Sequence, residues 1–348
     1  MRYTLFGRTG LRVSELALGA MTLGSHETDP RAVTATSGRI IDAYLEAGGN
    51  VIDTADIYGS SELVLGEVLG RRRDSIVLAG KYTCATSKGD VNAAGNHRRN
   101  LVHSVESSLA RLDTDRLDVL WVHARDNFTP VEEVMRALDD LVRTGKVLYI
   151  GVSDWPAWEI AQASTLAELR GWTAFAGSQF RYSLLERTPE RELLPQARAF
   201  DQAVFAWSPL ARGRLTGKDL PTGPEAPDSG WDEARRREHE TIAAVVEIAR
   251  EGGWTPAQVA LAWLRGRAGN IVPIIGASTE SQLADNLSCL EVTLDAAAVA
   301  RLDAVSAVPL GFPHDFLREP GVVETVYGDR WADIDDRRST YRRTTGGA

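Results

Sequence analysis

Short apolar segments alternate with longer segments of helical periodicity along most of the chain, and this alternation limits the fold more than any other feature. The apolar segments are rich in Val, Ile and Leu, as are strands of a parallel sheet that is covered on both faces. We predict eight such strands, at residues 16–21, 51–54, 76–80, 119–123, 147–153, 174–179, 204–208 and 271–276.

Each predicted strand is followed by a predicted helix. We expect helices at residues 31–47, 62–69, 99–111, 131–144, 157–168, 190–199, 238–250 with 256–267, and 281–287. Strict alternation produces a parallel sheet covered by helices, and eight units favour a closed barrel. The Gly-x-Gly-x-x-Gly pattern of an open dinucleotide-binding sheet is missing after the first strand, at residues 18–24. We therefore predict one α/β domain over residues 1–348, a (β/α)8 TIM barrel.

Three segments lie outside this repeat. Residues 2–5 and 11–13 flank a Gly-containing turn and predict an N-terminal β-hairpin. Residues 210–232 contain several prolines and glycines, which indicates a long loop at the rim. The C-terminal tail, residues 308–348, is irregular and polar. Its early part is a candidate lid, and we expect roughly its last dozen residues to be disordered.

Composition argues against several classes of protein. The chain has 39 Lys and Arg against 48 Asp and Glu, a net charge of −9, which disfavours nucleic acid as a partner. Two cysteines, Cys84 and Cys289, do not form a disulfide framework and fit a reducing compartment. The first residues lack the apolar stretch of a signal peptide, and no uncharged run approaches membrane-spanning length. We expect a cytoplasmic protein with no membrane partner.

Three successive strands end in an ionisable residue, namely Asp53, Lys81 and His123. Taken singly, these residues suit a helix cap, a solvent-exposed amine and a buried core histidine. In a barrel, however, the three strand ends lie side by side on the C-terminal rim, where active sites of this fold lie. Tyr58 follows Asp53 on the same loop. The four residues together therefore indicate a candidate active site.

The chemistry of this set suggests proton transfer. A free tyrosine has a pKa of about 10, and a cation such as Lys81 is predicted to lower the pKa of Tyr58 by stabilising the phenolate. Asp53 would hold Lys81 charged and in place, and His123 would orient a substrate oxygen or pass a proton. A serine hydrolase has little support, because no Gly-x-Ser-x-Gly elbow is present. Neither the histidines nor the cysteines have the spacing of a zinc site, so we expect no metal.

These residues lie in motifs that resemble the aldo-keto reductase superfamily over nearly the whole chain. The run Asp53-Thr54-Ala55-Asp56-Ile57-Tyr58-Gly59, with Lys81 and His123, matches the catalytic tetrad of that family in order and residue type. Residues 144–153, 179–185, 207–218 and 273–286 resemble the family's signatures at strands five to eight. Residues 311–316 are similar to the C-terminal region of the aryl-alcohol-dehydrogenase-like branch.

The resemblance implies NADPH-dependent reduction of an aldehyde or ketone to an alcohol. Tyr58 would donate the proton, with Asp53, Lys81 and His123 as its catalytic partners. The residues implied to bind the cofactor are Ser153, Asp154, Gln179, Trp207, Ser208, Leu210, Gly213, Lys218, Gly276, Ser278, Gln282 and Asn286.

Within this set the resemblance implies separate roles. Ser153 and Gln179 would hold the carboxamide, and Trp207 would stack on the nicotinamide ring. Ser278, Gln282 and Asn286 would contact the adenosine end of the cofactor. The pattern Thr279-x-x-Gln282 independently predicts a capping box, and a helix that starts there directs free N–H groups at an anion.

The chain departs from many relatives at three of these positions. Asp154 stands where they have Asn, and a carboxylate has no N–H₂ donor for the carboxamide oxygen. Ser278 stands where they have Arg or Lys for the 2′-phosphate, which leaves NADH as an alternative to NADPH. Arg212 or Lys218 could compensate for that loss. Trp207 replaces the more usual Tyr, and stacking survives the change.

Two other functions remain open at this point. One is a nicotinamide-binding regulatory protein with vestigial reductase activity, and the other is a hydrolase or isomerase on the same barrel. For a reductase, we expect a small carbonyl substrate that is aromatic or bulky. The residues that suggest such a substrate are Met21, Trp155, Trp207, Phe312 and Phe316.

Overall fold

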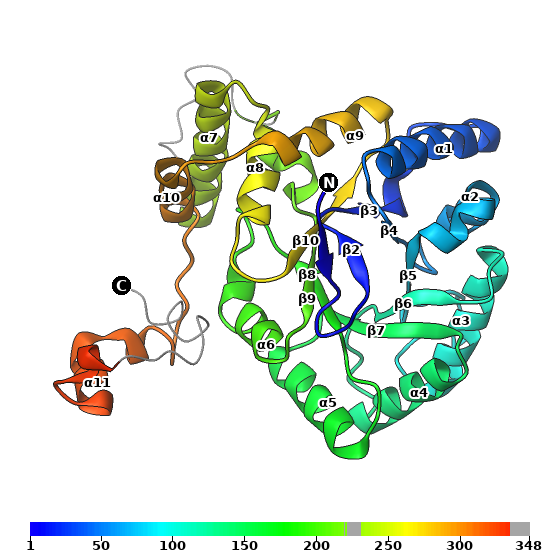
Figure 1. Cartoon of the computed structure of the whole chain (residues 1–348), viewed down its shortest axis with the longest axis horizontal. Coiled ribbons are helices and arrows are strands. Elements are labelled where there is room, and N and C mark those ends of the chain that lie inside the picture. Colours follow the sequence, from blue (N-terminus) through cyan, green and yellow to red (C-terminus); the bar gives the residue numbers. More distant parts are fainter. Residues whose placement is uncertain (219, 221–230, 335–348) are drawn as a thin grey trace.

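Eight parallel strands form a closed barrel in the part of the chain that the computed structural model describes, residues 1–218, 220 and 231–334 (Figure 1). Around the ring they are β3 (Ala17–Gly19), β4 (Val51–Asp53), β5 (Val77–Tyr82), β6 (Leu117–Val122), β7 (Val147–Ser153), β8 (Gly177–Arg181), β9 (Ala203–Trp207) and β10 (Ile271–Gly276). β10 pairs with β3 and closes the ring. The predicted (β/α)8 barrel is therefore confirmed.

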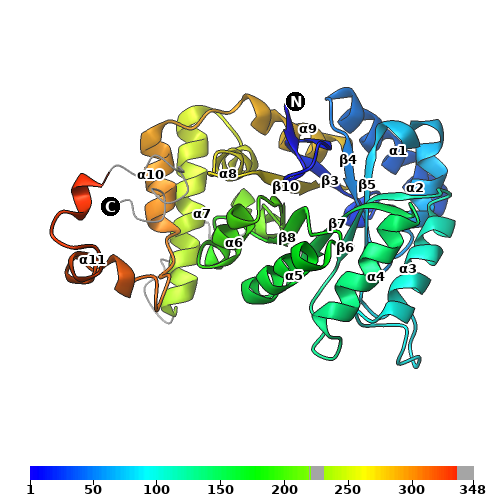
Figure 2. The same ribbon diagram turned by 60° about the horizontal axis from the view of Figure 1, so that its bottom comes forward.

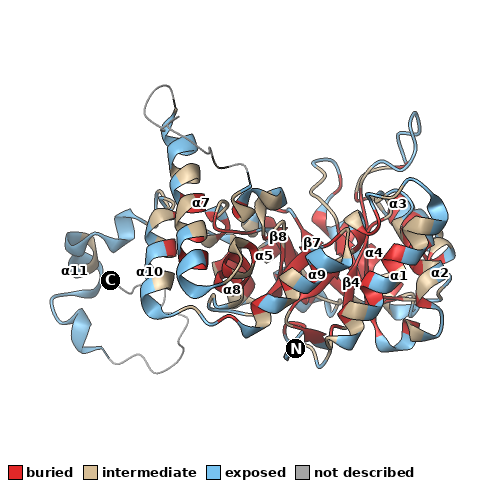
Figure 3. Cartoon of the chain, turned by 90° about the horizontal axis from the view of Figure 1, so that it is seen from above, coloured by how far each residue is buried: buried red, intermediate tan, exposed pale blue. Residues whose placement is uncertain are grey.

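Helices surround this barrel and bury one face each against it. They are α1 (Pro30–Glu46), α2 (Ser61–Leu69), α3 (Arg98–Arg111), α4 (Val131–Arg143), α5 (Ala157–Arg170), α6 (Leu193–Ala199), α7 (Glu233–Gly252), α8 (Pro256–Arg265) and α9 (Glu280–Leu287). In α4, Val134, Leu138 and Leu141 lie at helical spacing and are buried, as an amphipathic helix requires. Figure 3 shows the same division, with buried residues in the strands and exposed residues on the outer helix faces.

Two predicted helix boundaries were wrong for local reasons. α7 begins at Glu233, several residues before the predicted start, because the Asp232 side chain caps it by accepting from the Arg235 N–H at 2.8 Å. α6 begins only at Leu193, because Thr188–Glu190 forms a separate 3-10 turn. Within that turn, the Glu190 carboxylate accepts two hydrogen bonds from the Arg187 guanidinium.

The predicted N-terminal hairpin is present and covers one end of the barrel. β1 (Tyr3–Leu5) pairs antiparallel with β2 (Arg12–Ser14). Phe6, in the connecting loop, is fully buried, with ring centroids 5.9 Å from Trp121 and 5.7 Å from Phe205. These aromatic contacts fill the N-terminal end of the barrel, so the opposite, C-terminal end is the one left for a site.

The tail lies beside the barrel wall. After α10 (Ala296–Val305), a helix that our sequence analysis did not predict, the chain reaches α11 (Pro320–Tyr327). Figures 1 and 2 both place α11 outside the ring of helices, and in Figure 2 it lies beyond α7 and α10. The segment expected to be disordered lies largely outside the described residues, as does much of the predicted rim loop. Among the described helices, none is both long and apolar enough to cross a membrane.

Candidate active site

A cavity of about 890 Å³ opens at the C-terminal end of the barrel. Its lining includes three of the four predicted catalytic residues, Asp53, Tyr58 and His123, while Lys81 lies buried beneath them. All of the predicted cofactor-binding residues also line it: Ser153, Asp154, Gln179, Trp207, Ser208, Leu210, Gly213, Lys218, Gly276, Ser278, Gln282 and Asn286. The structure therefore brings together residues that the sequence spreads over more than two hundred positions.

Strand register places the catalytic set. β4 ends at Asp53, which pairs with Ala79 on β5, and Lys81 lies two residues further along that strand. Lys81 pairs in turn with Trp121 on the next strand, β6. Just after β6, the His123 N–H donates to the Tyr82 carbonyl at 2.9 Å. Because β4, β5 and β6 are adjacent and parallel, their last side chains reach the same rim.

Lys81 and Asp53 form a buried ion pair. The two residues are 1 % and 3 % exposed. The Lys81 ammonium donates to the carboxylate and, at 3.0 Å, to the Thr54 carbonyl. Gln179 donates its side-chain N–H to the other carboxylate oxygen at 3.0 Å. Burial opposes the charged ammonium, but Asp53 and Tyr58 outweigh it, so the pKa of Lys81 lies above its ordinary value. Lys81 is therefore a fixed, fully charged cation.

Tyr58 lies against this cation, with the Lys81 ammonium 4.8 Å from its ring centroid. Lys81 lowers the pKa of Tyr58, as the sequence predicts, but its effect is smaller than that of burial. Burial raises that pKa above the ordinary value, and the ammonium only partly offsets the effect. The phenol therefore keeps its proton at neutral pH, which is the state that a proton donor requires.

His123 faces Tyr58 edge to face, with ring centroids 5.8 Å apart. Burial, together with the positive charge of Lys81, lowers the pKa of His123 to about 3. The ring is therefore neutral near neutral pH, with one N–H donor and one acceptor nitrogen. Of the two roles predicted for it, the structure favours orientation of an oxygen atom over transfer of a proton.

Asp154 and Trp207 are joined directly across the cavity. The Trp207 indole N–H donates to the Asp154 carboxylate at 3.1 Å, and the Arg181 guanidinium lies 4.6 Å from the indole ring. Burial raises the pKa of Asp154, although the indole N–H and Arg181 oppose that effect. An Asn at this position would lack the charge that holds the indole N–H and balances Arg181. The two departures from the usual family residues, at Asp154 and Trp207, are therefore in direct contact with each other.

The far end of the cavity lies where β10 leads into α9. Thr279 caps α9 by accepting from the Gln282 N–H at 3.2 Å. The reciprocal bond of the predicted capping box is displaced by one residue, because the Gln282 side chain accepts from the Ser278 N–H at 2.9 Å. Asn286 donates to the Gly276 carbonyl at 3.0 Å. These bonds hold the start of α9 at the cavity wall.

The loop after β9 adds positive charge to this end. Arg212 and Lys218 both line the cavity, and Arg212 has a φ of 58°, in the left-handed region. That backbone turn continues through Gly213, which has a φ of 85°. Among the described residues, no other arginine or lysine lines the cavity.

Some of the residues predicted for the substrate pocket line the cavity and others do not. Met21 and Trp207 line the cavity, and Met21 is 63 % exposed. Trp155 is instead buried, packed against Phe175 and the Arg125 guanidinium. Phe312 and Phe316 lie outside the cavity with the rest of the described tail, so the lid that we expected there is not formed by residues 308–334.

Our sequence analysis assigned no functional role to several further residues that line the cavity, namely Gly19, Thr22, Ser25, Thr216, Ala257, Ile274, Ile275, Ala277 and Asp285. Most of them are small or apolar, and their types carry no chemical signal. Proximity to the ends of the predicted first and eighth strands was the signal that could have found Gly19 and Ala277.

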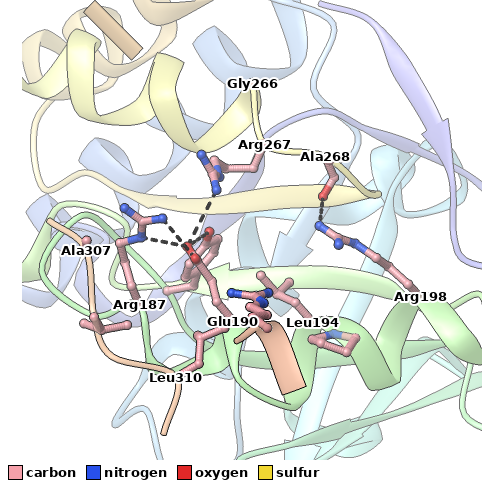
Figure 4. Close-up of a pocket in the computed structure, with 13 residues that line it drawn as sticks. Arg187, Glu190, Leu194, Arg198, Gly266, Arg267, Ala268, Ala307 and Leu310 are labelled. Carbon is pink, nitrogen blue, oxygen red and sulfur yellow. Dashed lines mark hydrogen bonds and ion pairs between the residues drawn. The ribbon is translucent and has the colours of Figure 1, made fainter. Parts of the chain in front are cut away.

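A second cavity, of about 410 Å³, lies against the barrel wall near the tail (Figure 4). Its arginines point inward, but they have partners in the protein. Arg187 donates to the Glu190 carboxylate at 2.7 and 2.9 Å, and Arg198 donates to the Ala268 carbonyl at 2.8 Å. Nearby, Arg191 donates to the Pro309 carbonyl in the tail at 2.7 Å. This region attaches the tail to the barrel and has no catalytic set.

No group of three or more His, Cys, Asp or Glu side chains within the described residues is arranged to hold a metal ion. The main cavity presents the neutral phenol and the neutral imidazole above the buried cation, next to an extended groove that ends at Arg212 and α9.

Comparison with known proteins identifies the family of the chain. A sequence model of the Aldo/keto reductase family matches residues 15–307. The chain is 37 % identical to an uncharacterised oxidoreductase, YrpG, of Bacillus subtilis, over 89 % of this chain and 98 % of the relative. It is 37 % identical to a norsolorinic acid reductase of Emericella nidulans, over 89 % and 82 %. It is 34 % identical to a putative aryl-alcohol dehydrogenase of Saccharomyces cerevisiae, over 90 % and 89 %. The chain is an oxidoreductase and belongs to the aldo/keto reductase family.

Proposed function

We propose that the protein reduces an aldehyde or ketone to an alcohol, with NADPH as the hydride source and Tyr58 as the proton donor. The observation that carries the proposal is the neutral Tyr58 phenol beside the buried Lys81 ammonium, on the wall of a large cavity. A hydrolase would not need a cavity that extends from this phenol to the start of α9.

The residues present fit a nicotinamide dinucleotide. The cavity lies within the range of typical cofactor sites, about 300–1,000 Å³, and the Trp207 indole lines its wall for ring stacking. Arg212 and Lys218 supply positive charge for phosphates, and the N-terminus of α9 directs N–H groups toward an anion. When bound, the cofactor supplies a hydride to the carbonyl carbon.

The protein's own residues manage the proton. The carbonyl oxygen would lie between the Tyr58 hydroxyl and the His123 ring, which both line the cavity. Tyr58 donates its proton to that oxygen as negative charge develops there. Lys81 then stabilises the phenolate that remains, and Asp53 keeps Lys81 charged and in place. Neutral His123 orients the carbonyl oxygen through its N–H.

Arg212 and Lys218 favour NADPH over NADH in this proposal. Ser278 has no charge to pair with a 2′-phosphate, and its hydroxyl already donates to Gln282 at 2.9 Å. The two cations on the β9 loop therefore become the candidates for that phosphate.

Aromatic or bulky carbonyl compounds are the proposed substrates. Met21 and Trp207 offer apolar surface at the cavity, and two relatives carry the names norsolorinic acid reductase and aryl-alcohol dehydrogenase.

The test is an assay of purified protein with NADPH or NADH and a panel of carbonyl compounds, from nitrobenzaldehyde to short aliphatic aldehydes. We expect loss of reduced nicotinamide absorbance, fastest with NADPH and an aromatic aldehyde. Quenching of protein fluorescence by NADPH without turnover on any substrate would favour a regulatory protein instead. If NADPH caused no quenching and no substrate were turned over, the result would contradict the proposal. It would favour a nicotinamide-independent enzyme.

A further inference from the structure

Cys84 contacts the candidate catalytic histidine directly. Its sulfur lies 3.7 Å from His123 Nδ1, within hydrogen-bonding distance for sulfur. Cys84 follows β5 by two residues and His123 directly follows β6, so the two residues belong to neighbouring rim loops. The roles proposed so far for the catalytic set do not use this contact.

A buried asparagine holds the two loops together. Asn96 is fully buried, and its side-chain oxygen accepts from the Thr83 hydroxyl at 2.6 Å, one residue before Cys84. Its side-chain N–H donates to the Ala124 carbonyl at 3.0 Å, one residue after His123. The same side chain therefore fixes the backbone on both sides of the sulfur–imidazole contact.

Thr83 also carries backbone strain. Its φ is 124°, a conformation that a β-branched residue rarely adopts. Strain of this kind persists only where surrounding contacts impose it, and it concentrates at functional sites. Here the hydrogen bond to Asn96, together with the Gly95 N–H that donates to the Thr83 carbonyl at 2.7 Å, imposes it. The strained residue is the one that directs the chain into Cys84.

The protonation states of Cys84 and His123 determine which of the two groups donates the hydrogen bond. Burial raises the pKa of the Cys84 thiol, with Asp56 adding to the effect, so the S–H proton is retained at neutral pH. The neutral His123 ring has one acceptor nitrogen. If Nδ1 accepts from the thiol, Nε2 carries the ring proton and is left as a donor for the cavity that His123 lines.

We propose that Cys84 is a positioning residue, whose thiol donates to His123 Nδ1 and thereby holds the imidazole in the Nε2–H tautomer that a carbonyl oxygen requires. The catalytic half of this inference rests on the proposed reductase function. The tautomer itself does not, because it is a property of the protein before any substrate or cofactor binds.

The direct test is NMR of histidine-¹⁵N-labelled protein, in which nitrogen shifts distinguish the two tautomers. We expect the Nε2–H form in the wild type, and also in Cys84→Ser, whose hydroxyl can donate to Nδ1. In Cys84→Ala the preference should be lost, and the two nitrogens should shift toward each other. Cys289→Ala is the matched control, because it removes the other thiol, which is buried in the hydrophobic core after α9.

Activity provides the second readout. We expect kcat for the carbonyl substrate to fall by about ten-fold in Cys84→Ala, as when one orienting hydrogen bond is lost, and to recover in Cys84→Ser. Unchanged nitrogen shifts in Cys84→Ala would overturn the proposal. So would a Cys84→Ser variant that resembles Cys84→Ala while circular dichroism shows it folded. If the nitrogen shifts change in Cys84→Ala but the wild type turns over no substrate, the result would support the proposed role of Cys84 in setting the tautomer. It would count only against the reductase function.

Discussion

Gln179 on β8 donates its side-chain N–H to the Asp53 carboxylate on β4 at 3.0 Å, across the inside of the barrel. The same carboxylate accepts from Lys81 through its other oxygen. Asp53 is therefore held from two sides, and a residue that we assign to the cofactor also supports the catalytic ion pair.

This relationship predicts losses of stability of different size for two substitutions at Gln179. Gln179→Glu places a second carboxylate beside buried Asp53, and like charges at this distance disfavour the folded state. Gln179→Met removes only the hydrogen bond. We expect Gln179→Glu to lower the free energy of unfolding more than Gln179→Met does at neutral pH, measured by urea denaturation. Equal losses would mean that the Gln179–Asp53 contact has no electrostatic role.

Asp56 should make stability depend on pH. Burial, with the nearby Glu62 carboxylate adding to it, raises the pKa of Asp56 to about 7, whereas an unfolded chain has a value of about 4. Between those values the folded protein retains a proton that the unfolded chain has released, so stability falls as the pH rises through this range.

Asp56→Asn removes that dependence. We expect the free energy of unfolding of the variant, relative to wild type, to rise between about pH 5 and about pH 8. Asp115→Asn, at an exposed aspartate, is the control and should show no such trend. A flat difference for Asp56→Asn would mean that its carboxyl is already ionised at the lower pH.

His123 should make stability depend on pH in the opposite direction from Asp56. Burial and Lys81 lower its pKa to about 3, while an unfolded histidine titrates near about 6.5. The unfolded chain therefore binds the extra proton between these values, and the contribution of His123 to stability is lost as the pH falls from about 6.5 toward 3. His123→Gln should show a shallower acid loss in urea titrations. An equally steep loss in that variant would assign acid sensitivity to other groups.

Removal of the tail after Leu310 should leave catalysis intact. The truncation keeps the Arg191–Pro309 contact, and none of the described residues that it removes lines the cavity. We expect unchanged KM values for cofactor and substrate in steady-state assays. A marked rise in substrate KM would mean that the tail closes over the site during turnover.

The barrel was predictable because its determinants are local. The apolar runs and helical periodicities each occupy a few residues, and the strand-end positions of Asp53, Lys81 and His123 follow from strand order alone. Recognition of the family motifs then supplied the cofactor-binding set, and the structure brings that set to one cavity.

The errors concern properties that depend on burial and on contacts between distant residues. The sign of the pKa change at Tyr58 depends on how completely the barrel buries it, which no local pattern reveals. The Cys84–His123 contact and the Asp154–Trp207 bond join residues that lie 39 and 53 positions apart in the sequence. Phe312 resembled a pocket residue in sequence, but it is 85 % exposed, because its segment leaves the barrel.

The central claim is that Tyr58 supplies the proton, and Tyr58→Phe tests it most directly. The phenyl ring keeps the shape and the contact with Lys81, and it removes only the hydroxyl. We predict that kcat falls by about 10²–10⁴-fold, the usual contribution of a general acid, while NADPH still quenches the protein fluorescence with the wild-type dissociation constant. Wild-type turnover in the variant would contradict the account.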